Sequence, residues 1–546
     1  MEGFKALILL WCVWVFLLLL SHSSSLEAAK VRHYNFDVEY FFKSVDCFEQ
    51  LVMGINGQFP GPTIRAEVGD ILDINVTNKL STEGTSIHWH GIRQYGTPWA
   101  DGSVSISQCA INPGETFNYR FKLNKAGTYF YHGHNGLQVT GGLYGSIIVD
   151  LPNGQKEPFH YDDEINLLLS DWWHKSIQEQ DVGLTNSIET FRWVWEPQTY
   201  RIRIASTASL LSLNLAISNH NMVVVEADGN YVEPFTVDKI DIYSGESYSV
   251  LLTTDQNPNQ NYWISVGHRD DNVSTTQALT LLNYKGISAS ILPSFPPPIT
   301  PPWYDVEERL AFTNKVVALK GTPQPPKYSQ RRIHLLGNQD LIDGYLRWGM
   351  NGISLSLPST PYLGSIKFNL TDAFDWNDPP ETFPRDYDIY NPPTIHNLVM
   401  GNMVYKFQLN EVVDVILQNA NSLALNSTAF HPWHLHGHEF WVLGYGNGTF
   451  KDGDDEKLFN LKNPPLKNTV VIFPYGWTAI RFRADNPGVW AFHCHMEPHY
   501  HTGMGVVFAE GVEYVKRIPE QALACGLTAK MLMNKEGLLL PIVKTI

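Results

Sequence analysis

Residues 493–504 read HCHMEPHYHTGM, which places one cysteine between two histidines, with a third histidine and a methionine close behind. In a β-strand, successive side chains point to opposite faces, so His493 and His495 share one face while Cys494 projects from the other. The stretch therefore predicts a strand whose two faces serve two different sites.

The face that carries Cys494 has further candidate ligands nearby. His499 and Met504 follow it, and His431 opens another histidine-rich stretch, HPWHLHGH (431–438). Two histidines, one thiolate and a weak axial thioether form the ligand set of a blue-copper electron-transfer centre. Zinc also binds Cys and His, but structural zinc sites favour more than one cysteine, so the methionine favours copper.

The opposite face belongs to a repeated pattern of histidine pairs. Four His-x-His pairs occur, namely His88 and His90, His132 and His134, His434 and His436, and His493 and His495. One such pair alone is more often an ordinary surface or packed pair. Eight imidazoles, however, are too many for one metal and suit a cluster of two or three. Because the pairs come from both ends of the chain, we expect the cluster between the first and last domains.

One short peptide joins the two predicted sites. An electron that arrives at a metal on Cys494 can leave through the backbone to His493 and His495. Reduction of dioxygen to two waters needs four electrons, and a mononuclear copper together with a three-copper cluster stores four. The spacing therefore favours a copper-dependent oxidoreductase that uses dioxygen as acceptor.

Length and composition favour a large all-β protein. The 546 residues suffice for three domains of about 150 residues each, and 43% of them are hydrophobic. The 41 Gly, 33 Pro and 12% aromatic residues favour strands joined by turns. The segments with strand signals are 70–76, 117–121, 143–150, 222–227, 238–253 and 260–267.

The chain divides into a leader, three domains and a linker. Residues 1–29 are predicted as a signal peptide, because the apolar run after Lys5 is shorter than the ~20 residues of a membrane anchor and ends in a serine cluster. We predict domains at 30–157, 158–300 and 330–546. A proline-rich stretch at 292–303 leads into a linker at 301–329, since consecutive prolines cannot donate sheet hydrogen bonds.

Charge and sequons bear on the partners and the compartment. With Lys+Arg 39 against Asp+Glu 55, the formal charge of −16 repels phosphate backbones and anionic lipids, so we expect no nucleic-acid partner and no membrane partner after signal removal. A homodimer is compatible with the sequence. A secreted chain would expose Asn-x-Ser/Thr sequons for glycosylation at Asn75, Asn272, Asn369, Asn426 and Asn447.

Four blocks of the sequence carry a family resemblance. Residues 88–102, 129–149, 431–446 and 493–511 resemble the four copper signatures of multicopper oxidases, and within that family they are most similar to the ascorbate oxidases of plants. The resemblance implies three cupredoxin-like Greek-key domains and four copper ions. It also implies secretion to the plant cell wall, ascorbate as the small-molecule reductant, and dioxygen as acceptor.

Individual roles follow from the same resemblance. The type 1 ligands are His431, Cys494, His499 and Met504; the type 2 ligands are His88 and His434; the type 3 ligands are His90, His132, His134, His436, His493 and His495. Cys494, His493, His495 and His499 carry the electrons. The reductant is expected beside His499 with Trp193 and Trp348 as walls, although core packing is the ordinary role of a tryptophan.

The chain departs from the family pattern in two places. Thr502 stands where a larger apolar residue is usual beside the type 1 site, and the second domain is shortened between 196–199 and 200–203. The shortening removes the residue that pairs with Cys47, while Cys109 and Cys525 keep their implied disulfide. A lost strand removes core contacts, so an inactive truncated isoform is one alternative.

Other activities remain as alternatives to ascorbate oxidation. A laccase-like phenol oxidase is the nearest, although Met504 and the wording EPHYHTGM speak against it. A non-catalytic wall protein is expected to lose copper ligands, and this chain retains them. Copper storage does not require a cysteine flanked by cluster ligands.

Overall fold

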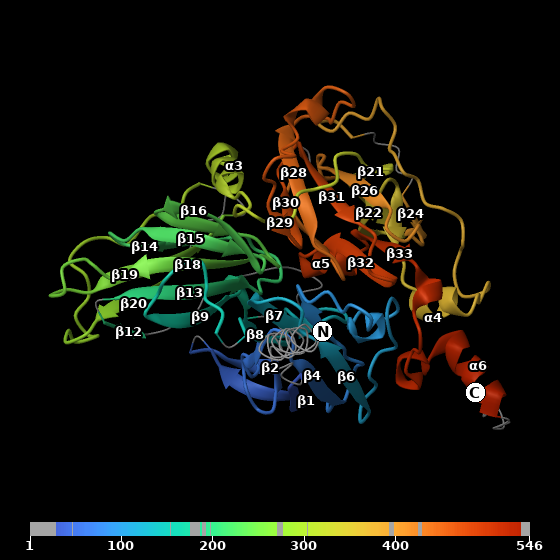
Figure 1. Cartoon of the computed structure of the whole chain (residues 1–546), viewed down its shortest axis with the longest axis horizontal. Coiled ribbons are helices and arrows are strands. Elements are labelled where there is room, and N and C mark those ends of the chain that lie inside the picture. The colour runs from blue at the N-terminus through green and yellow to red at the C-terminus, as the bar shows by residue number, and fades with distance from the viewer. Residues whose placement is uncertain are drawn as a thin grey trace, which may run out of the picture.

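The computed structural model describes residues 29–45, 47–152, 154–174, 186–187, 193–196, 198–269, 277–302, 304–392, 398–423 and 428–536, with the backbone alone at 186–187, 193–195 and 535–536. Strands are the main secondary structure of these residues, as the composition predicts. They form three β domains that follow one another along the chain (Figure 1).

The first domain is a sandwich of two four-stranded sheets, β2-β1-β4-β6 and β3-β8-β7-β5. The strands are β1 (Val31–Ser44), β2 (Glu49–Ile55), β3 (Ile64–Glu67), β4 (Ile71–Asn78), β5 (Ile87–His90), β6 (Thr116–Lys122), β7 (Gly127–Gly133) and β8 (Tyr144–Asp150), with a short 3-10 helix η1 (Pro98–Ala100). Alternation along β4 buries Leu72, Ile74 and Val76 between the sheets. The second sheet carries the first two histidine pairs.

The second domain is a sandwich of two five-stranded sheets, β16-β15-β18-β13-β9 and β12-β20-β19-β14-β17. Its strands are β9 (Asp163–Leu169), β12 (Trp193–Trp195), β13 (Thr199–Ser206), β14 (Leu213–Ile217), β15 (Met222–Ala227), β16 (Asn230–Val237), β17 (Lys239–Ile242), β18 (Ser247–Thr253), β19 (Tyr262–His268) and β20 (Gln277–Tyr284), beside the two-stranded pair β10 (Trp172–Trp173) and β11 (Asn186–Ser187). The strands on both sides of the predicted shortening are paired: β12 with β20, and β13 with β9 and β18.

The third domain packs an eight-stranded sheet, β24-β23-β22-β21-β26-β31-β28-β29, on a five-stranded sheet, β25-β33-β32-β27-β30. The strands are β21 (Arg331–Ile342), β22 (Tyr345–Met350), β23 (Ile353–Leu355), β24 (Val399–Gly401), β25 (Val404–Phe407), β26 (Val412–Gln418), β27 (His431–Leu435), β28 (Phe440–Asn447), β29 (Leu466–Lys467), β30 (Thr469–Ile472), β31 (Gly476–Arg483), β32 (Gly488–Cys494) and β33 (Gly505–Glu510). Its helices are α4 (Tyr362–Lys367), α5 (Glu497–His501) and α6 (Gly526–Glu536), with 3-10 turns η2 (Asp455–Leu458), η3 (Val512–Tyr514) and η4 (Glu520–Leu523).

One continuous hydrophobic core runs through the first and third domains, whereas the second domain has a core of its own. The shared core includes Trp89 of β5 and Trp433 of β27, both completely buried. Burial of this apolar surface is the main force that holds the chain ends together.

The predicted strand segments are found in the structure, and the predicted linker region contains a helix. Each of the six segments with strand signals overlaps a strand of the structure. The stretch 291–302 has no helix or strand, but the predicted linker contains helix α3 (Val306–Lys315). Asp305 caps this helix by accepting a hydrogen bond from the Glu308 amide at 3.1 Å, and Phe312 is buried. A good cap and one buried face thus make a helix where proline content indicated a spacer.

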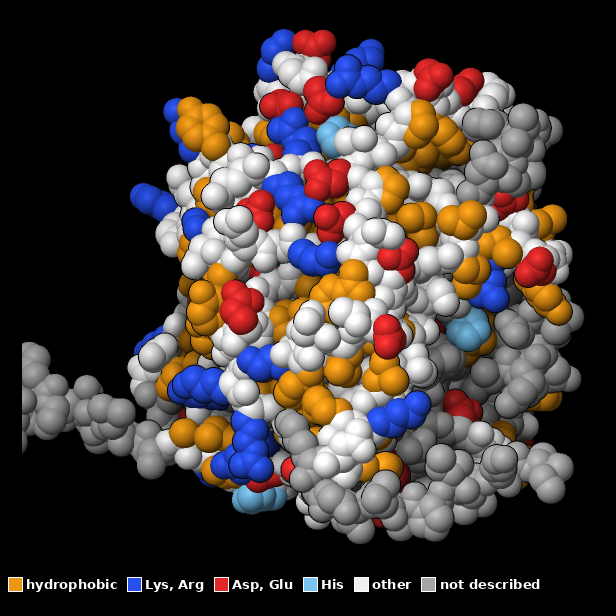
Figure 2. All heavy atoms as spheres, turned by 90° about the vertical axis from the view of Figure 1, so that its right-hand side faces the viewer, with side chains coloured by type: hydrophobic (Ala, Val, Ile, Leu, Met, Phe, Trp, Pro, Cys, Tyr) orange, Lys and Arg blue, Asp and Glu red, His pale blue; other side chains and the backbone are white. Residues whose placement is uncertain are grey.

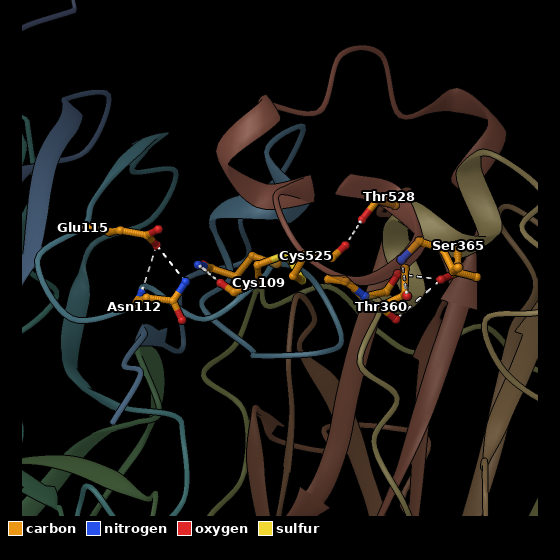
Figure 3. Close-up of a disulfide and its surroundings, with 10 residues drawn as sticks. Cys109, Asn112, Glu115, Thr360, Ser365, Cys525 and Thr528 are labelled. Atoms are coloured by element: carbon orange, nitrogen blue, oxygen red, sulfur yellow. Dashed lines mark hydrogen bonds between the residues drawn. A yellow bond between two sulfur atoms is a disulfide. The ribbon is translucent and has the colours of Figure 1, made fainter. Parts of the chain in front are cut away.

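A disulfide between Cys109 and Cys525 ties the first domain to the C-terminal segment (Figure 3). It lies next to a backbone hydrogen bond of 3.2 Å from Cys109 N to Ala522 O. Cys47 is exposed and free. Both results agree with the pairing that the family resemblance implies.

The remaining predictions concern the surface charge, the glycosylation sequons, the signal segment and the membrane. Lysine and arginine are interspersed with aspartate and glutamate over the face in Figure 2. Among the sequons, Asn75, Asn369 and Asn447 are exposed, while Asn272 and Asn426 lie outside the described residues, as does the signal segment 1–28. Among the described residues, no helix is long and apolar enough to cross a membrane.

Candidate metal centre

Strand pairing brings the histidine pairs together. In the first domain, His88 on β5 lies directly across from His132 on β7, with His90 further along β5. In the third domain, His434 on β27 lies across from His493 on β32. The other pair members, His134, His436 and His495, each lie one position after the end of their strand, so the pattern i, i+2 keeps both rings of a pair on one side.

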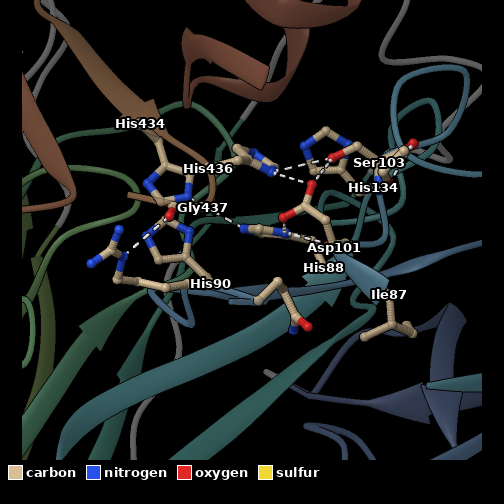
Figure 4. Close-up of polar contacts among 12 residues, drawn as sticks. Ile87, His88, His90, Asp101, Ser103, His134, His434, His436 and Gly437 are labelled. Carbon is tan, nitrogen blue, oxygen red and sulfur yellow. Dashed lines mark hydrogen bonds and ion pairs between the residues drawn. The ribbon is translucent and has the colours of Figure 1, made fainter. Parts of the chain in front are cut away.

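The eight rings meet between the first and third domains, where Figure 4 shows His88, His90, His134, His434 and His436 turned toward one another. The shortest nitrogen distances are 3.3 Å between Nε2 of His88 and of His434, 3.3 Å between Nε2 of His134 and of His493, 3.0 Å between Nε2 of His436 and of His493, and 3.2 Å between Nε2 of His495 and Nδ1 of His90. The Nε2 atom of His132 is buried and has no hydrogen-bond partner among the described residues. We call this group of eight residues the histidine cluster.

The outer ring nitrogens are held by oxygen atoms. Backbone carbonyls accept from Nδ1 of His88 (Asp101 O, 2.7 Å), His132 (Gly133 O, 2.9 Å), His434 (Asn468 O, 2.8 Å) and His493 (Cys494 O, 2.9 Å). Because a carbonyl oxygen only accepts, these four nitrogens carry the proton, which leaves the inner nitrogen of each ring with its lone pair free. The side chain of Asn468 accepts in the same way from His90 Nε2 at 3.1 Å.

Burial keeps seven of the eight rings neutral. Loss of hydration, helped by repulsion between neighbouring rings, lowers the pKa of His132 to about 3 and that of His493 to about 4. The same two causes hold the pKa values of His90, His134, His434, His436 and His495 well below their ordinary range. Neutral imidazole is the form that binds metal ions.

These contacts fit a metal cluster better than a packed core. The outer nitrogens of His88, His434, His436 and His493 donate to oxygen atoms, so lone pairs face each other at 3.3 Å between His88 and His434 and at 3.0 Å between His436 and His493. Such an arrangement in a buried space is repulsive unless a cation lies between the rings. Three groups of ring nitrogens lie close enough to share an ion: His88, His90 and His132; His88, His434 and His436; and His134, His436 and His493. Imidazole donors of this kind suit copper.

Cys494 belongs to a separate group on the other side of β32. Its Sγ lies 3.7 Å from Nδ1 of His431 and 3.7 Å from Nδ1 of His499. Met504 is completely buried in the same core, and its carbonyl accepts a hydrogen bond from the Cys494 amide at 3.1 Å. We call His431, Cys494, His499 and Met504 the sulfur site.

The chemistry of the sulfur site also fits a soft metal. Burial raises the pKa of the Cys494 thiol far above its ordinary value, so the thiolate forms here only with a compensating cation. Burial lowers the pKa of His499 to about 4. A thiolate and two neutral imidazoles with a thioether nearby suit copper.

Of the two tryptophans predicted to line the reductant site, only Trp348 has a described side chain. The Trp348 ring lies 4.8 Å from the His499 ring and 4.9 Å from the His431 ring, and only 6% of the residue is exposed. Trp193 is in β12, but its side chain lies outside the described residues. His438, the last residue of the stretch HPWHLHGH, places its Nε2 2.8 Å from Glu510 Oε1.

Sequence reasoning missed Asp101, which holds two rings of the histidine cluster. Its side chain accepts hydrogen bonds from His436 Nδ1 at 2.9 Å and from Ser103 at 2.7 Å, while its backbone carbonyl binds His88 (Figure 4). The only signal was its place in the first copper signature, PWADG.

Glu497 was also missed, and it lines a cavity of about 430 Å³ together with His134, His493 and Tyr500. Its carboxylate accepts from the amides of Val139 and Thr140, both at 2.8 Å. Burial raises its pKa to about 7, so both protonation states are accessible near neutral pH. A titratable group therefore lies beside the histidine cluster.

Fold and sites together define a class: a multidomain β-sandwich protein with one cysteine-containing and one histidine-rich candidate metal site. Three family models, each described as multicopper oxidase, match residues 37–154, 186–287 and 361–513. The chain belongs to the multicopper oxidase family.

Individual relatives agree with this membership. The chain is 58% identical to L-ascorbate oxidase of Cucurbita maxima, with 96% of this chain and 97% of the relative covered, and 59% identical to L-ascorbate oxidase of Cucumis sativus, with 92% of each covered. It is 34% identical to Laccase-11 of Arabidopsis thaliana, with 88% of this chain and 92% of that protein covered. The resemblance to plant ascorbate oxidases is confirmed.

Solved structures match over most of the fold. Fet3p, a multicopper oxidase that functions in iron import, gives a TM-score of 0.76 at 25% identity and covers 92% of this chain and 95% of its own. The laccase of Botrytis aclada gives 0.75 at 26% identity, with 95% and 94% covered.

The alignment with the Cucurbita relative also bears on the shortened second domain. It spans 566 positions, more than the 546 residues of this chain, so that relative has residues with no counterpart here. The place of the shortening, between 196–199 and 200–203, stays a prediction.

Proposed function

We propose that this chain is a secreted L-ascorbate oxidase, which takes electrons singly from ascorbate and passes four of them to dioxygen to give two waters. The relatives named L-ascorbate oxidase, at 58% and 59% identity, support the substrate. Removal of residues 1–29 and export to the plant cell wall are part of the proposal.

The proposal assigns four copper ions to the two sites. The sulfur site holds the type 1 ion, His88 and His434 hold the type 2 ion, and the other six rings of the histidine cluster hold the type 3 pair. The close approaches His88–His434, His134–His436–His493 and His90–His495 support this division. Copper supplies reversible one-electron chemistry in each site.

The residues of the chain supply the path for electrons and protons. His499 offers its ring edge to the reductant, and the peptide from Cys494 to His493 and His495 joins the sulfur site to the histidine cluster. Asp101 holds the rings of His88 and His436 in place. Glu497, with its pKa near neutral, delivers protons to the cavity where water forms.

One observation carries the proposal: neighbouring residues of β32 serve opposite sites. The Cys494 sulfur lies 3.7 Å from His431, while the adjacent His493 lies 3.0 Å from His436. Hydrophobic packing alone does not require a thiol and the adjacent imidazole to lie in two separate groups of histidines.

Oxygen uptake by purified residues 30–546 tests the proposal. We expect ascorbate to drive uptake faster than a diphenol does, with a matching loss of ascorbate. Faster uptake with the diphenol would instead support a laccase-like phenol oxidase. Copper-loaded protein that consumes no oxygen with either reductant would indicate an inactive truncated isoform.

A further inference from the structure

The second domain supplies none of the proposed copper ligands, yet one of its turns contacts the histidine cluster. The turn Tyr243–Glu246 joins β17 to β18 and is closed by a hydrogen bond of 3.0 Å from Glu246 N to Tyr243 O. Gly245 occupies its third position with φ +86°, the conformation that a type II turn requires there. Ser244, at the second position, is 1% exposed.

The Ser244 hydroxyl determines which nitrogen of His495 carries the proton. Its Oγ bonds the Ala208 carbonyl, lies 3.1 Å from the His495 carbonyl, and lies 2.8 Å from His495 Nδ1. A hydroxyl has a single proton, and the carbonyls can only accept it, so Nδ1 must be the donor to Oγ. The lone pair of His495 is then on Nε2, which faces His90 inside the cluster.

Gly245 gives the His495 ring its space. A Cβ at this position would lie 2.7 Å from Cγ and 2.8 Å from Cδ2 of His495, closer than such atoms approach in proteins. Any other residue would therefore push the imidazole away, in addition to the strain of its positive φ.

A second loop of the second domain contacts Glu497, which lies two residues after His495. Ser209 O accepts a hydrogen bond of 2.8 Å from the Glu497 amide. The Asp171 carboxylate fixes this loop by accepting from the amides of Ser209 at 2.6 Å and Leu210 at 2.9 Å. Both contacts fall on the segment just after β32, which ends at Cys494.

We propose that the second domain positions the histidine cluster, with Ser244 fixing the tautomer and orientation of His495 and Gly245 leaving room for its ring. The inference rests on the proposed copper function and deepens it. Ser244 contacts neither substrate nor metal, so it is a positioning residue. Loss of the partner of an outer ring nitrogen typically costs about 10–100-fold in metal affinity or activity.

Ser244→Ala tests the inference, with Ser206→Ala as matched control, because Ser206 is a buried serine of the same domain whose Oγ has no hydrogen-bond partner among the described residues. Both variants are made in residues 30–546. Chelator competition measures copper affinity, absorption measures the blue band of the sulfur site, and thermal unfolding of the copper-free protein measures stability.

We expect Ser244→Ala to bind cluster copper about 10-fold more weakly than Ser206→Ala, with the same blue band and the same copper-free stability. Gly245→Ala, which keeps the hydroxyl but displaces the ring, should weaken the same copper. If Ser244→Ala matches its control in affinity, or loses copper from both sites through unfolding, the inference is wrong while the function stands. If the wild-type chain binds no copper, the proposed function itself fails.

Discussion

The sulfur site and the histidine cluster are one residue apart along the chain but differ in how they are built. The sulfur site takes its side chains from β27, β32 and the segment after β32, all within the third domain. The histidine cluster needs the first domain docked on the third, and its His495 also contacts the second domain. A site within one domain survives damage that separates domains, whereas an interdomain site does not.

The largest expected effect is that of Cys494→Ser, which should abolish the sulfur site and leave the histidine cluster intact. A hydroxyl is a poor ligand for copper compared with a thiolate, so the blue band and ascorbate-driven oxygen uptake should both disappear. The rings of the histidine cluster should be unaffected. Absorption and oxygen uptake provide the check, and a variant that stays blue would remove Cys494 from the sulfur site.

Glu497→Gln should damage only the chemistry at the histidine cluster. The amide keeps the size of the side chain but cannot exchange a proton, so oxygen uptake should fall about 100-fold while copper content stays the same. Because burial raises the Glu497 pKa to about 7, the wild-type side chain is protonated below that pH. The wild-type rate should therefore fall as pH rises through about 7.

In the Glu497→Gln variant this fall with pH should be absent. A variant with wild-type turnover and an unchanged pH profile would exclude Glu497 as the proton donor.

Removal of the interdomain disulfide should weaken the histidine cluster more than the sulfur site. The bond joins residues 416 positions apart, and loss of such a cross-link typically costs about 2–5 kcal/mol. Cys525→Ser should lower the thermal unfolding temperature and release cluster copper to a chelator before the blue band fades. Cys47→Ser is the control, because Cys47 is exposed and free. Equal loss from both sites would contradict the comparison.

Thr502→Met should have the smallest effect, confined to the surroundings of the sulfur site. The Thr502 hydroxyl donates to Pro498 O at 2.7 Å at the end of α5, and loss of that bond costs about 1 kcal/mol. Copper content should not change, and the blue band should shift without bleaching. Loss of the band would show that Thr502 holds the site rather than tunes it.

The sequence predicted the features that depend on local alternation. Alternation of side chains in an extended strand is enough to assign Cys494 to one site and His493 and His495 to another. The predicted strand segments rest on the same two-residue period. The disulfide of Cys109 with Cys525 came from the family resemblance. Both kinds of prediction need no knowledge of how distant segments pack.

The missed features depend on tertiary packing. Asp101 is an ordinary acidic residue until folding places it against His88 and His436, and Ser244 is one serine among many until its turn reaches His495. Helix α3, by contrast, was missed for a local reason, because the prolines before it dominate the composition. Contacts between segments hundreds of residues apart leave no periodic trace in a single sequence.

Copper stoichiometry shows whether the two faces of β32 serve separate metal sites. Purified residues 30–546 and their Cys494→Ser variant are loaded with copper, desalted and analysed for metal per chain. We expect about four ions per chain in the wild type and about three in the variant. Equal copper in both proteins, or none in a folded wild type, would contradict this expectation.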